Sequence, residues 1–275
     1  MLEARTGRTR AKLHLISNPM YPMWEPFDPD GLSPIAKFGD LVEIVEWAAG
    51  KGEPAPLDGI CIDGEFISAT DRFRVARMPM DAKKSIYKQV TIPASITKVL
   101  SKHMGDVEVG LGESHLLIMP DDSTQIKATL FGVTHPDLSK FFHATEPDCV
   151  KFKRSELIEI IDRAMVMSGR DRTPALRMYL DKERIAVLMI DEHNGQIGDV
   201  IDVPGYCQHD RHQIIFSPRL ILDALNHSPN EDIEMWYDQT KPTRPVRLEG
   251  GSGYQVIIVP RKDLSPIREA GSDNG

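Results

Sequence analysis

The chain has 275 residues, of which 41% are hydrophobic and 27% charged, so it is long enough to bury a sizeable core and polar enough to stay in solution. Its formal net charge of −8 argues against tight general binding of nucleic acid, although a local basic surface remains compatible with it. No run approaches the roughly 18 apolar residues of a membrane helix and no signal peptide is visible, which predicts a cytoplasmic protein.

Residues 1–31 differ from the rest of the chain. Four basic residues open it: Arg5, Arg8, Arg10 and Lys12. Residues 11–17 have the alternation of one strand, and four prolines between residues 19 and 29 then forbid regular structure. We expect an adaptor or partly ordered arm, with contact to DNA or to a partner as the alternative.

From residue 32 onward, one small unit recurs four times. Similar amphipathic stretches open at residues 32, 92, 152 and 216, which are 60, 60 and 64 residues apart. Before the last three, apolar residues two apart predict a half-buried strand, as in residues 90–92. Pro34, Pro93 and Pro218 stand where a first-turn proline of a helix is tolerated.

Each unit is predicted to hold one amphipathic helix followed by antiparallel strands. We expect helices near residues 34–49, 93–104, 154–167 and 218–226, with Ile96, Val99, Leu100 and Met104 facing inward in the second. The strands are expected at residues 60–62, 66–68, 74–76, 107–110, 116–119, 126–130, 176–180, 185–190, 233–237, 246–248 and 255–259. Asp63-Gly64 and Asn194-Gly195 predict hairpin turns.

Two such units form a domain, and two domains form the chain. The predicted fold class is therefore α+β, with tandem domains of paired helix-plus-antiparallel-sheet units. We divide the chain into an N-terminal arm (1–31), a first domain (32–146), a second domain (147–262) and a polar C-terminal tail (263–275). Each helix has an apolar face for a sheet, so its other face is wet or meets a ligand.

The order of four short segments resembles the bacterial DNA polymerase III beta subunits, which are sliding clamps. The segments are residues 57–60, 69–76, 135–141 and 255–261, and the resemblance covers about residues 32–262. The first two and the third resemble that family's second domain, and the last resembles the family's C-terminal ending. Within residues 135–141, His135 and Leu138 replace two aromatic residues of the family, so only Pro136-Asp137 matches strictly.

The resemblance implies the DNA-clamp fold and a processivity factor, not an enzyme, with no cofactor. Clamps are closed rings whose helices line a hole for duplex DNA, held without sequence preference, and a polymerase and possibly a clamp loader bind the ring. Weak phosphate contacts then permit sliding. Bacterial clamps carry three domains per chain and close as dimers, whereas two domains per chain imply a homotrimer joined head to tail. The shortened chain also suggests a bacteriophage origin, inside a bacterial host cell.

Two sets of residues would carry this function. The expected DNA-binding residues are Lys98, Lys102, Lys153, Arg154, Arg170, Arg172 and Arg219. The resemblance assigns a groove for a partner peptide to Leu57, Thr70, Arg74, Val75, Pro136, Phe141, Ile257 and Val259. Arg72 and Phe73 stand where the family usually has Gly and often has His, and Phe141 is bulkier than the usual aliphatic residue, which changes the groove's shape.

Other interpretations remain open. The basic residues could belong to solvated faces of mixed charge, and Leu57, Val75, Ile257 and Val259 could be plain strand core. Cys207, His209, Asp210 and His212 form a cluster that could suggest a metal, but no second ligand group has suitable spacing, so we expect none. The three cysteines are expected to be reduced thiols, with Cys61 buried in a strand. Gly250-Gly251-Ser252-Gly253 predicts a hairpin turn and not a phosphate loop. A clamp-like adaptor that binds polymerase or transcription partners without encircling DNA is the alternative function.

Overall fold

The computed structural model of the chain describes residues 2–6, 9–13, 31–82, 86–100, 105–142, 146–167, 174–181, 183–191, 195–203 and 212–262. The predicted DNA-binding residues Lys102, Arg170 and Arg172 lie outside these ranges, as do Met104, Cys207, His209 and Asp210. Among the helices within these ranges, none is long and apolar enough to cross a membrane.

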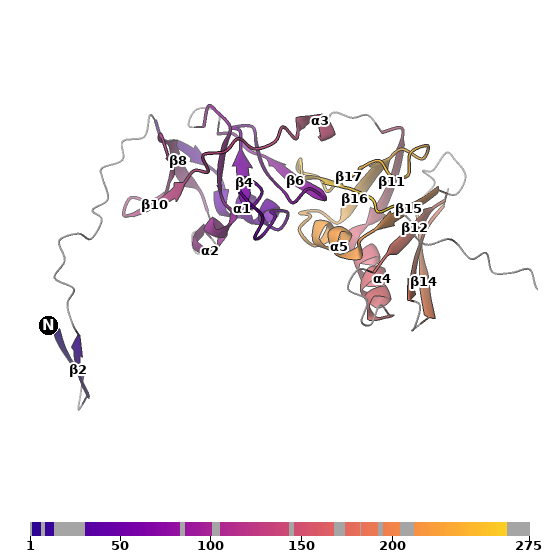
Figure 1. Cartoon of the computed structure of the whole chain (residues 1–275), viewed down its shortest axis with the longest axis horizontal. Coiled ribbons are helices and arrows are strands. Elements are labelled where there is room, and N and C mark those ends of the chain that lie inside the picture. Colours follow the sequence, from indigo (N-terminus) through magenta and orange to yellow (C-terminus); the bar gives the residue numbers. More distant parts are fainter. Residues whose placement is uncertain are drawn as a thin grey trace, which may run out of the picture.

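Four units follow the N-terminal region, and each has the predicted order of strand, helix and antiparallel strands (Figure 1). The first holds β3 (Ser33–Ile35), α1 (Phe38–Glu46), β4 (Gly59–Ile62), β5 (Phe66–Thr70) and β6 (Arg74–Pro79). The second holds β7 (Val90–Pro93), the 3-10 turn η1 (Ala94–Ile96), α2 (Thr97–Leu100), β8 (Val107–Leu111), β9 (His115–Asp121) and β10 (Thr124–Thr129).

The second half of the chain repeats this plan. The third unit holds β11 (Asp148–Lys153), α4 (Arg154–Met167), β12 (Leu176–Leu180), β13 (Arg184–Asp191) and β14 (Gly195–Asp202). The fourth holds β15 (His212–Phe216), α5 (Pro218–Asn226), β16 (Asp232–Tyr237), β17 (Val246–Glu249) and β18 (Gln255–Ile258). A short helix, α3 (Ser139–Phe142), lies in the connection between the halves, and β1 (Leu2–Thr6) pairs with β2 (Thr9–Leu13) in a separate two-stranded sheet.

Two predictions about the helices are wrong. Pro34 lies in strand β3, opposite Glu108, and the helix begins only at Phe38. Because β3 is the edge strand of its sheet, a residue without an N–H is tolerated there. In the second unit Val99 is 42% exposed instead of inward, while Leu100 is fully buried. The helix opens there with a 3-10 turn of about three residues per turn, which shifts the apolar face.

The strands exchange partners between the two units of each half. The first strand of each unit pairs with a strand of its neighbour: β3 with β8, β7 with β4, β11 with β16 and β15 with β12. One four-stranded sheet (β10-β9-β8-β3) therefore lies at one end of the chain and another (β14-β13-β12-β15) at the other end.

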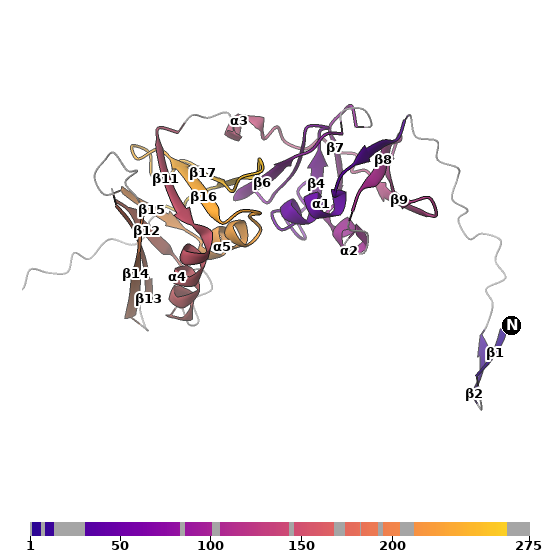
Figure 2. The same ribbon diagram turned by 180° about the vertical axis from the view of Figure 1, so that it is seen from behind.

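A continuous sheet joins the halves. The eight strands run in the order β11-β16-β17-β18-β6-β5-β4-β7, and β18 pairs antiparallel with β6. The helices α1, α2, α4 and α5 lie along the concave edge of the resulting crescent, and the sheets lie on its convex side (Figures 1 and 2). One contiguous hydrophobic core runs through both halves, with Phe38, Ile62, Phe216 and Val256 among its fully buried members.

The glycine-rich segment before the last strand is a turn between β17 and β18, as predicted. Gly251 and Gly253 have φ angles of 73° and 81°, the left-handed region that favours glycine. A Cβ atom at Gly250 would lie 2.1 Å from the Ser228 hydroxyl oxygen. These glycines are therefore explained by backbone shape and close packing.

Candidate functional site

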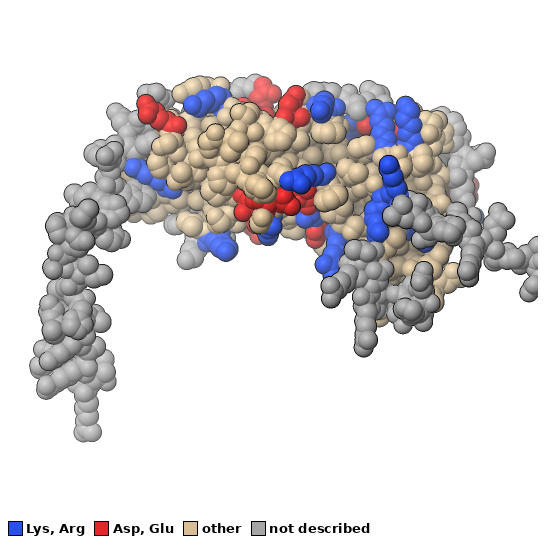
Figure 3. All heavy atoms as spheres, in the orientation of Figure 1, with Lys and Arg blue, Asp and Glu red and all other residues tan. Residues whose placement is uncertain are grey.

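The helices along the concave edge of the crescent carry charges of both signs. Their bases are Lys98, Arg154, Arg163 and Arg219, and their acids are Asp40, Glu43, Glu46, Glu156, Glu159, Asp162 and Asp223. Acids therefore outnumber bases on the helices of the described part of the chain. Figure 3 shows acidic side chains gathered near the middle of this edge.

Several of the predicted DNA-binding residues already have acidic partners. Lys153 pairs with Asp232, and Arg154 pairs with Glu231 at 3.2 Å. The hydrogen bond that Lys153 donates to Asp232 raises the pKa of the lysine, so this lysine stays protonated. Lys98 and Arg219 lie exposed on α2 and α5. The role of these residues in DNA binding stays a prediction.

At the junction of the halves, a small apolar cluster lies on the outer face of the central sheet. Val75 of β6 and Ile257 of β18 are direct partners across the junction, and they are only 6% and 3% exposed. Phe142 and Leu138, from the connection between the halves, pack on this pair. The structure thus brings the predicted groove residues Val75 and Ile257 together, and the connecting segment that carries Leu138 and Phe142 covers them.

Arg77 fixes this connecting segment to the central sheet. The Arg77 guanidinium lies between the rings of Phe66 and Phe142, 4.4 Å and 3.6 Å from their centroids. Its Nε and Nη2 donate to the Gln255 amide oxygen at 2.8 Å and 2.6 Å, across the β6–β18 junction. Burial lowers the pKa of Arg77 to about 10, which still leaves it charged at neutral pH. Phe142 is therefore fixed by a cation–π contact as well as by packing.

The other predicted groove residues lie around this cluster. Thr70 is buried, and its hydroxyl donates to the Arg74 carbonyl at 2.6 Å. The backbone N–H of Val259 donates to the Phe73 carbonyl at 2.9 Å. Pro136 is exposed, and Phe141 is 37% exposed. Leu57 is half-buried in the loop before β4, so the structure does not bring it into the cluster.

The turn between β5 and β6 forms the rim of this region. Arg72 has a φ of 79°, a left-handed conformation that is costly for a residue with a Cβ atom. The glycine that the resemblance predicts at this position would adopt this conformation without strain. Phe73, next to it, is 62% exposed. Phe73 directly precedes strand β6, which carries Val75 of the cluster.

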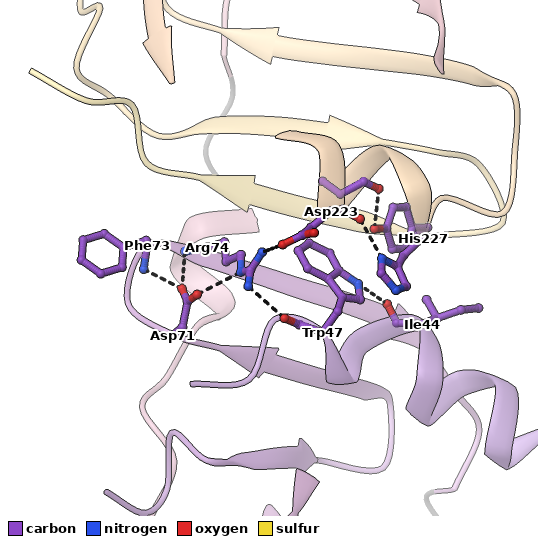
Figure 4. Close-up of polar contacts among 9 residues, drawn as sticks. Ile44, Trp47, Asp71, Phe73, Arg74, Asp223 and His227 are labelled. Atoms are coloured by element: carbon purple, nitrogen blue, oxygen red, sulfur yellow. Dashed lines mark hydrogen bonds and ion pairs between the residues drawn. The ribbon is translucent and has the colours of Figure 1, made fainter. Parts of the chain in front are cut away.

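Arg74 ties the two halves together on the helix side of the junction (Figure 4). Its guanidinium donates to Asp71 at 2.9 Å, to Asp223 of α5 at 2.5 Å and to the Trp47 carbonyl at 3.0 Å. Trp47 in turn stacks on His227, with ring centroids 5.2 Å apart. Arg74 belongs to the predicted groove, but in the structure it links the two halves of the chain. Sequence reasoning missed its partners Asp223 and Trp47.

A cavity of about 220 Å³ lies between the outer face of β4–β6 and residues 135–142. Its wall includes Cys61, Arg77 and His135. The His135 Nδ1 donates to the Pro136 carbonyl at 3.2 Å, and its buried Nε2 has no partner among the described residues. Burial lowers the pKa of His135 and raises the pKa of Cys61 to about 12, so both groups are neutral at pH 7. No group of three potential metal ligands occurs among the described residues.

The sequence matches no protein-family model and no curated protein sequence. Solved structures match it closely in shape: a DNA polymerase sliding clamp from Bacillus subtilis (TM-score 0.83, 19% identity) and the DNA polymerase III subunit beta from Pseudomonas aeruginosa (0.82, 18%). The beta subunit from the DNA polymerase of Streptococcus pyogenes is equally similar (0.82, 17%). Each match covers 95% of this chain and 72–74% of the solved chain. The predicted fold class is therefore confirmed: the chain has the fold of the DNA polymerase III beta sliding clamps.

Proposed function

We propose that this chain is a sliding clamp, which encircles duplex DNA and tethers a DNA polymerase to it. The observation that carries the proposal is the shared fold, in which helices line the concave edge of a crescent and sheets form its outer wall. A closed ring cannot leave a duplex sideways, so retention needs no strong attraction to phosphates. The mixed charge of the helices is compatible with this mode of retention.

Ring closure follows from the internal repeat. Within the chain, the last strands of units one and four, β6 and β18, pair and join the halves. The last strands of units two and three, β10 and β14, each form one edge of an end sheet, and β3 and β15 form the other edges. The same type of pairing between β10 of one copy and β14 of the next would continue the outer wall. Repetition of this contact closes a ring, since heterologous contacts close when the rotation allows it.

The number of copies follows from the number of domains. Three copies of this pair of domains supply six clamp domains, as two copies of a three-domain chain would, so we propose a homotrimer. Val200 on the edge strand β14 is 47% exposed, and Val166 on α4, which packs on β14, is 81% exposed. Association would cover these apolar side chains. The bacteriophage origin, the clamp loader and the domain boundaries at residues 31, 146 and 262 stay predictions.

The oligomeric state tests this arrangement. We expect light scattering of the purified chain to give the mass of three copies, and Val200→Lys to reduce it. Ile190→Lys is the matched control, because Ile190 is 44% exposed but lies on β13, one strand inside the edge. A trimer that survives Val200→Lys and dissociates with Ile190→Lys would contradict pairing through β14.

Topological retention tests the function itself. The protein is expected to stay on nicked circular plasmid during gel filtration and to be lost after the plasmid is cut once. Equal retention on the two forms would exclude sliding and favour the adaptor alternative. As a protein that holds DNA and polymerase without chemistry, the clamp needs no catalytic residue or cofactor, and it would act in the cytoplasm.

We further propose that the polymerase docks beside the Val75–Ile257–Phe142 cluster, with Phe73 and Phe141 as exposed anchors. A few central apolar residues carry most of the energy of such contacts. Phe73→Ala is expected to weaken the binding of short synthetic peptides with apolar anchors about tenfold, which corresponds to roughly 1.4 kcal/mol. Tyr87→Ala, at an equally exposed aromatic (65%) outside the cluster, should have no effect.

A further inference from the structure

Arg247 of β17 lies beside the apolar cluster on the outer face of the central sheet. It is directly opposite Ile257 of β18, and Ile257 is directly opposite Val75 of β6. Residues in direct opposition share a face of a sheet, so these three residues form one row on the face that Phe142 covers. The Arg247 side chain is only 11% exposed, and a charge that is buried to this extent needs acidic partners.

Arg247 has two such partners, one on its own strand and one in the connection between the halves. Its Nε lies 3.0 Å from the Glu249 Oε1. Its Nη1 lies 2.9 Å from the Glu146 Oε2, and the Glu146 side chain is only 3% exposed. The same Nη1 donates to the Phe142 carbonyl at 3.5 Å, a long hydrogen bond. Arg247 therefore ties the connection to the sheet at two positions along the chain.

A chain of polar contacts joins Arg247 to Arg77 across the β6–β18 junction. The Glu249 Oε1 accepts a hydrogen bond from the Gln255 Nε2 at 2.8 Å, and the Gln255 Oε1 accepts the two hydrogen bonds of Arg77. The two arginines hold different atoms of Phe142, because Arg77 lies against its ring and Arg247 lies near its carbonyl. Both halves of the chain therefore contribute to the position of Phe142.

The position of Phe142 determines where its neighbour Phe141 lies. The Phe141 backbone N–H donates to the Leu138 carbonyl at 3.1 Å, next to the four-residue helix α3. A helix of one turn is not stable by itself, so α3 depends on its contacts with the sheet. Phe141 is 37% exposed and is one of the two anchors of the proposed docking surface.

We propose that Arg247 is a positioning residue for the docking surface: by holding Phe142 and Glu146, it keeps Phe141 in place for a partner segment with apolar anchors. This inference rests on the proposed docking surface. Preorganisation raises the fraction of the free protein that is competent to bind, and its loss lowers the apparent affinity by the same factor. The association rate falls with the competent fraction, whereas the dissociation rate of the formed complex does not change.

The test compares the full-length wild type, Arg247→Gln and the double variant Glu146→Gln/Arg247→Gln. Native-state hydrogen exchange reports on the backbone N–H of Phe141. Stopped-flow fluorescence follows a labelled short synthetic peptide with apolar anchors that binds the wild type. In both variants we expect exchange to accelerate and association to slow, each about tenfold, with an unchanged dissociation rate. The double variant removes both members of the ion pair, so a buried carboxylate without its cation does not account for its effect.

Arg244→Gln is the matched control. Arg244 also pairs with a buried acid of the second half, Asp238 at 3.3 Å, and no ion pair or hydrogen bond joins it to the described residues of the connection. Wild-type exchange at Phe141 in the two variants, recovery of wild-type rates in the double variant, or an equal effect of Arg244→Gln overturns the proposal. So does faster dissociation with unchanged association, which would make Arg247 a direct contact of the peptide. If no peptide binds the wild type, the docking surface and this inference fail together, while retention on circular plasmid still reports on the ring.

Discussion

Removal of the Arg74 guanidinium is expected to weaken the junction between the two halves. Arg74→Ala breaks contacts to Asp71, Asp223 and the Trp47 carbonyl, and it leaves Asp71, which is 17% exposed, without its cation. A fully buried ion pair that loses one partner costs about 3–5 kcal/mol. Asp223 is 43% exposed and thus partly screened by water, so we expect a loss of about 2–3 kcal/mol in the free energy of unfolding.

Urea unfolding at fixed protein concentration, followed by tryptophan fluorescence, measures this loss, since Trp47 lies within the network. Arg72→Ala is the matched control: its pair with Glu53 is 62% and 42% exposed, which predicts less than about 1 kcal/mol. A double-mutant cycle with Asp223→Asn should give a coupling energy of about 1 kcal/mol between the two side chains. If Arg74→Ala costs no more than Arg72→Ala, the network does not hold the junction.

Three further outcomes follow from packing and burial. Gly250→Ala should lower the free energy of unfolding by about 2 kcal/mol or more, because the new Cβ atom would overlap the Ser228 hydroxyl. Gly132→Ala should be nearly neutral in the same urea titration, because its Cβ atom would have no neighbour within 4 Å. Because burial lowers the pKa of His135, the unfolded state takes up a proton at a higher pH than the folded state does. The free energy of unfolding should therefore fall as the pH drops below about 6.5. His135→Gln should make the urea midpoint less dependent on pH between about 7.5 and 5.5. With its pKa raised to about 12, the Cys61 thiol should react with iodoacetamide at pH 8 only after unfolding, as peptide mass spectrometry would detect; rapid alkylation of the native chain would contradict its burial.

The repeat and most of the secondary structure could be predicted from the sequence because they are encoded locally. The helices α4 and α5 have the predicted bounds, since each lies directly after an alternating strand and keeps a helical apolar face. For α1, Pro34 is equally compatible with a helix start and an edge strand, and only pairing with β8 decides between them. The four-residue helix α3 is too short for a periodic signal.

The candidate site was less predictable because its contacts join distant positions. Arg74 and Asp223 are 149 residues apart, and no local pattern links them. Lys153 and Arg154 have the charge expected of a DNA-binding surface, but their partners Asp232 and Glu231 come from the following unit. Phe142 gave no signal beyond its apolar character, although it covers Val75 and Ile257. The resemblance to a family indicated Arg74 and Val75 as site residues. Their contacts could be identified only from the three-dimensional structure.

The continuous sheet across β18 and β6 determines where a ring formed by this chain could open. The junction between β18 and β6 is stabilised by hydrogen bonds between the strands, by the contacts of Arg74 and by the packing of Phe142 on the sheet. All of these contacts lie within one covalent chain, so dilution does not separate the two halves. A contact between separate copies would instead depend on the protein concentration. If the chain forms the proposed ring, we expect the ring to open between copies, with each crescent moving as a stiff body, and a trimer would have three equivalent places to open.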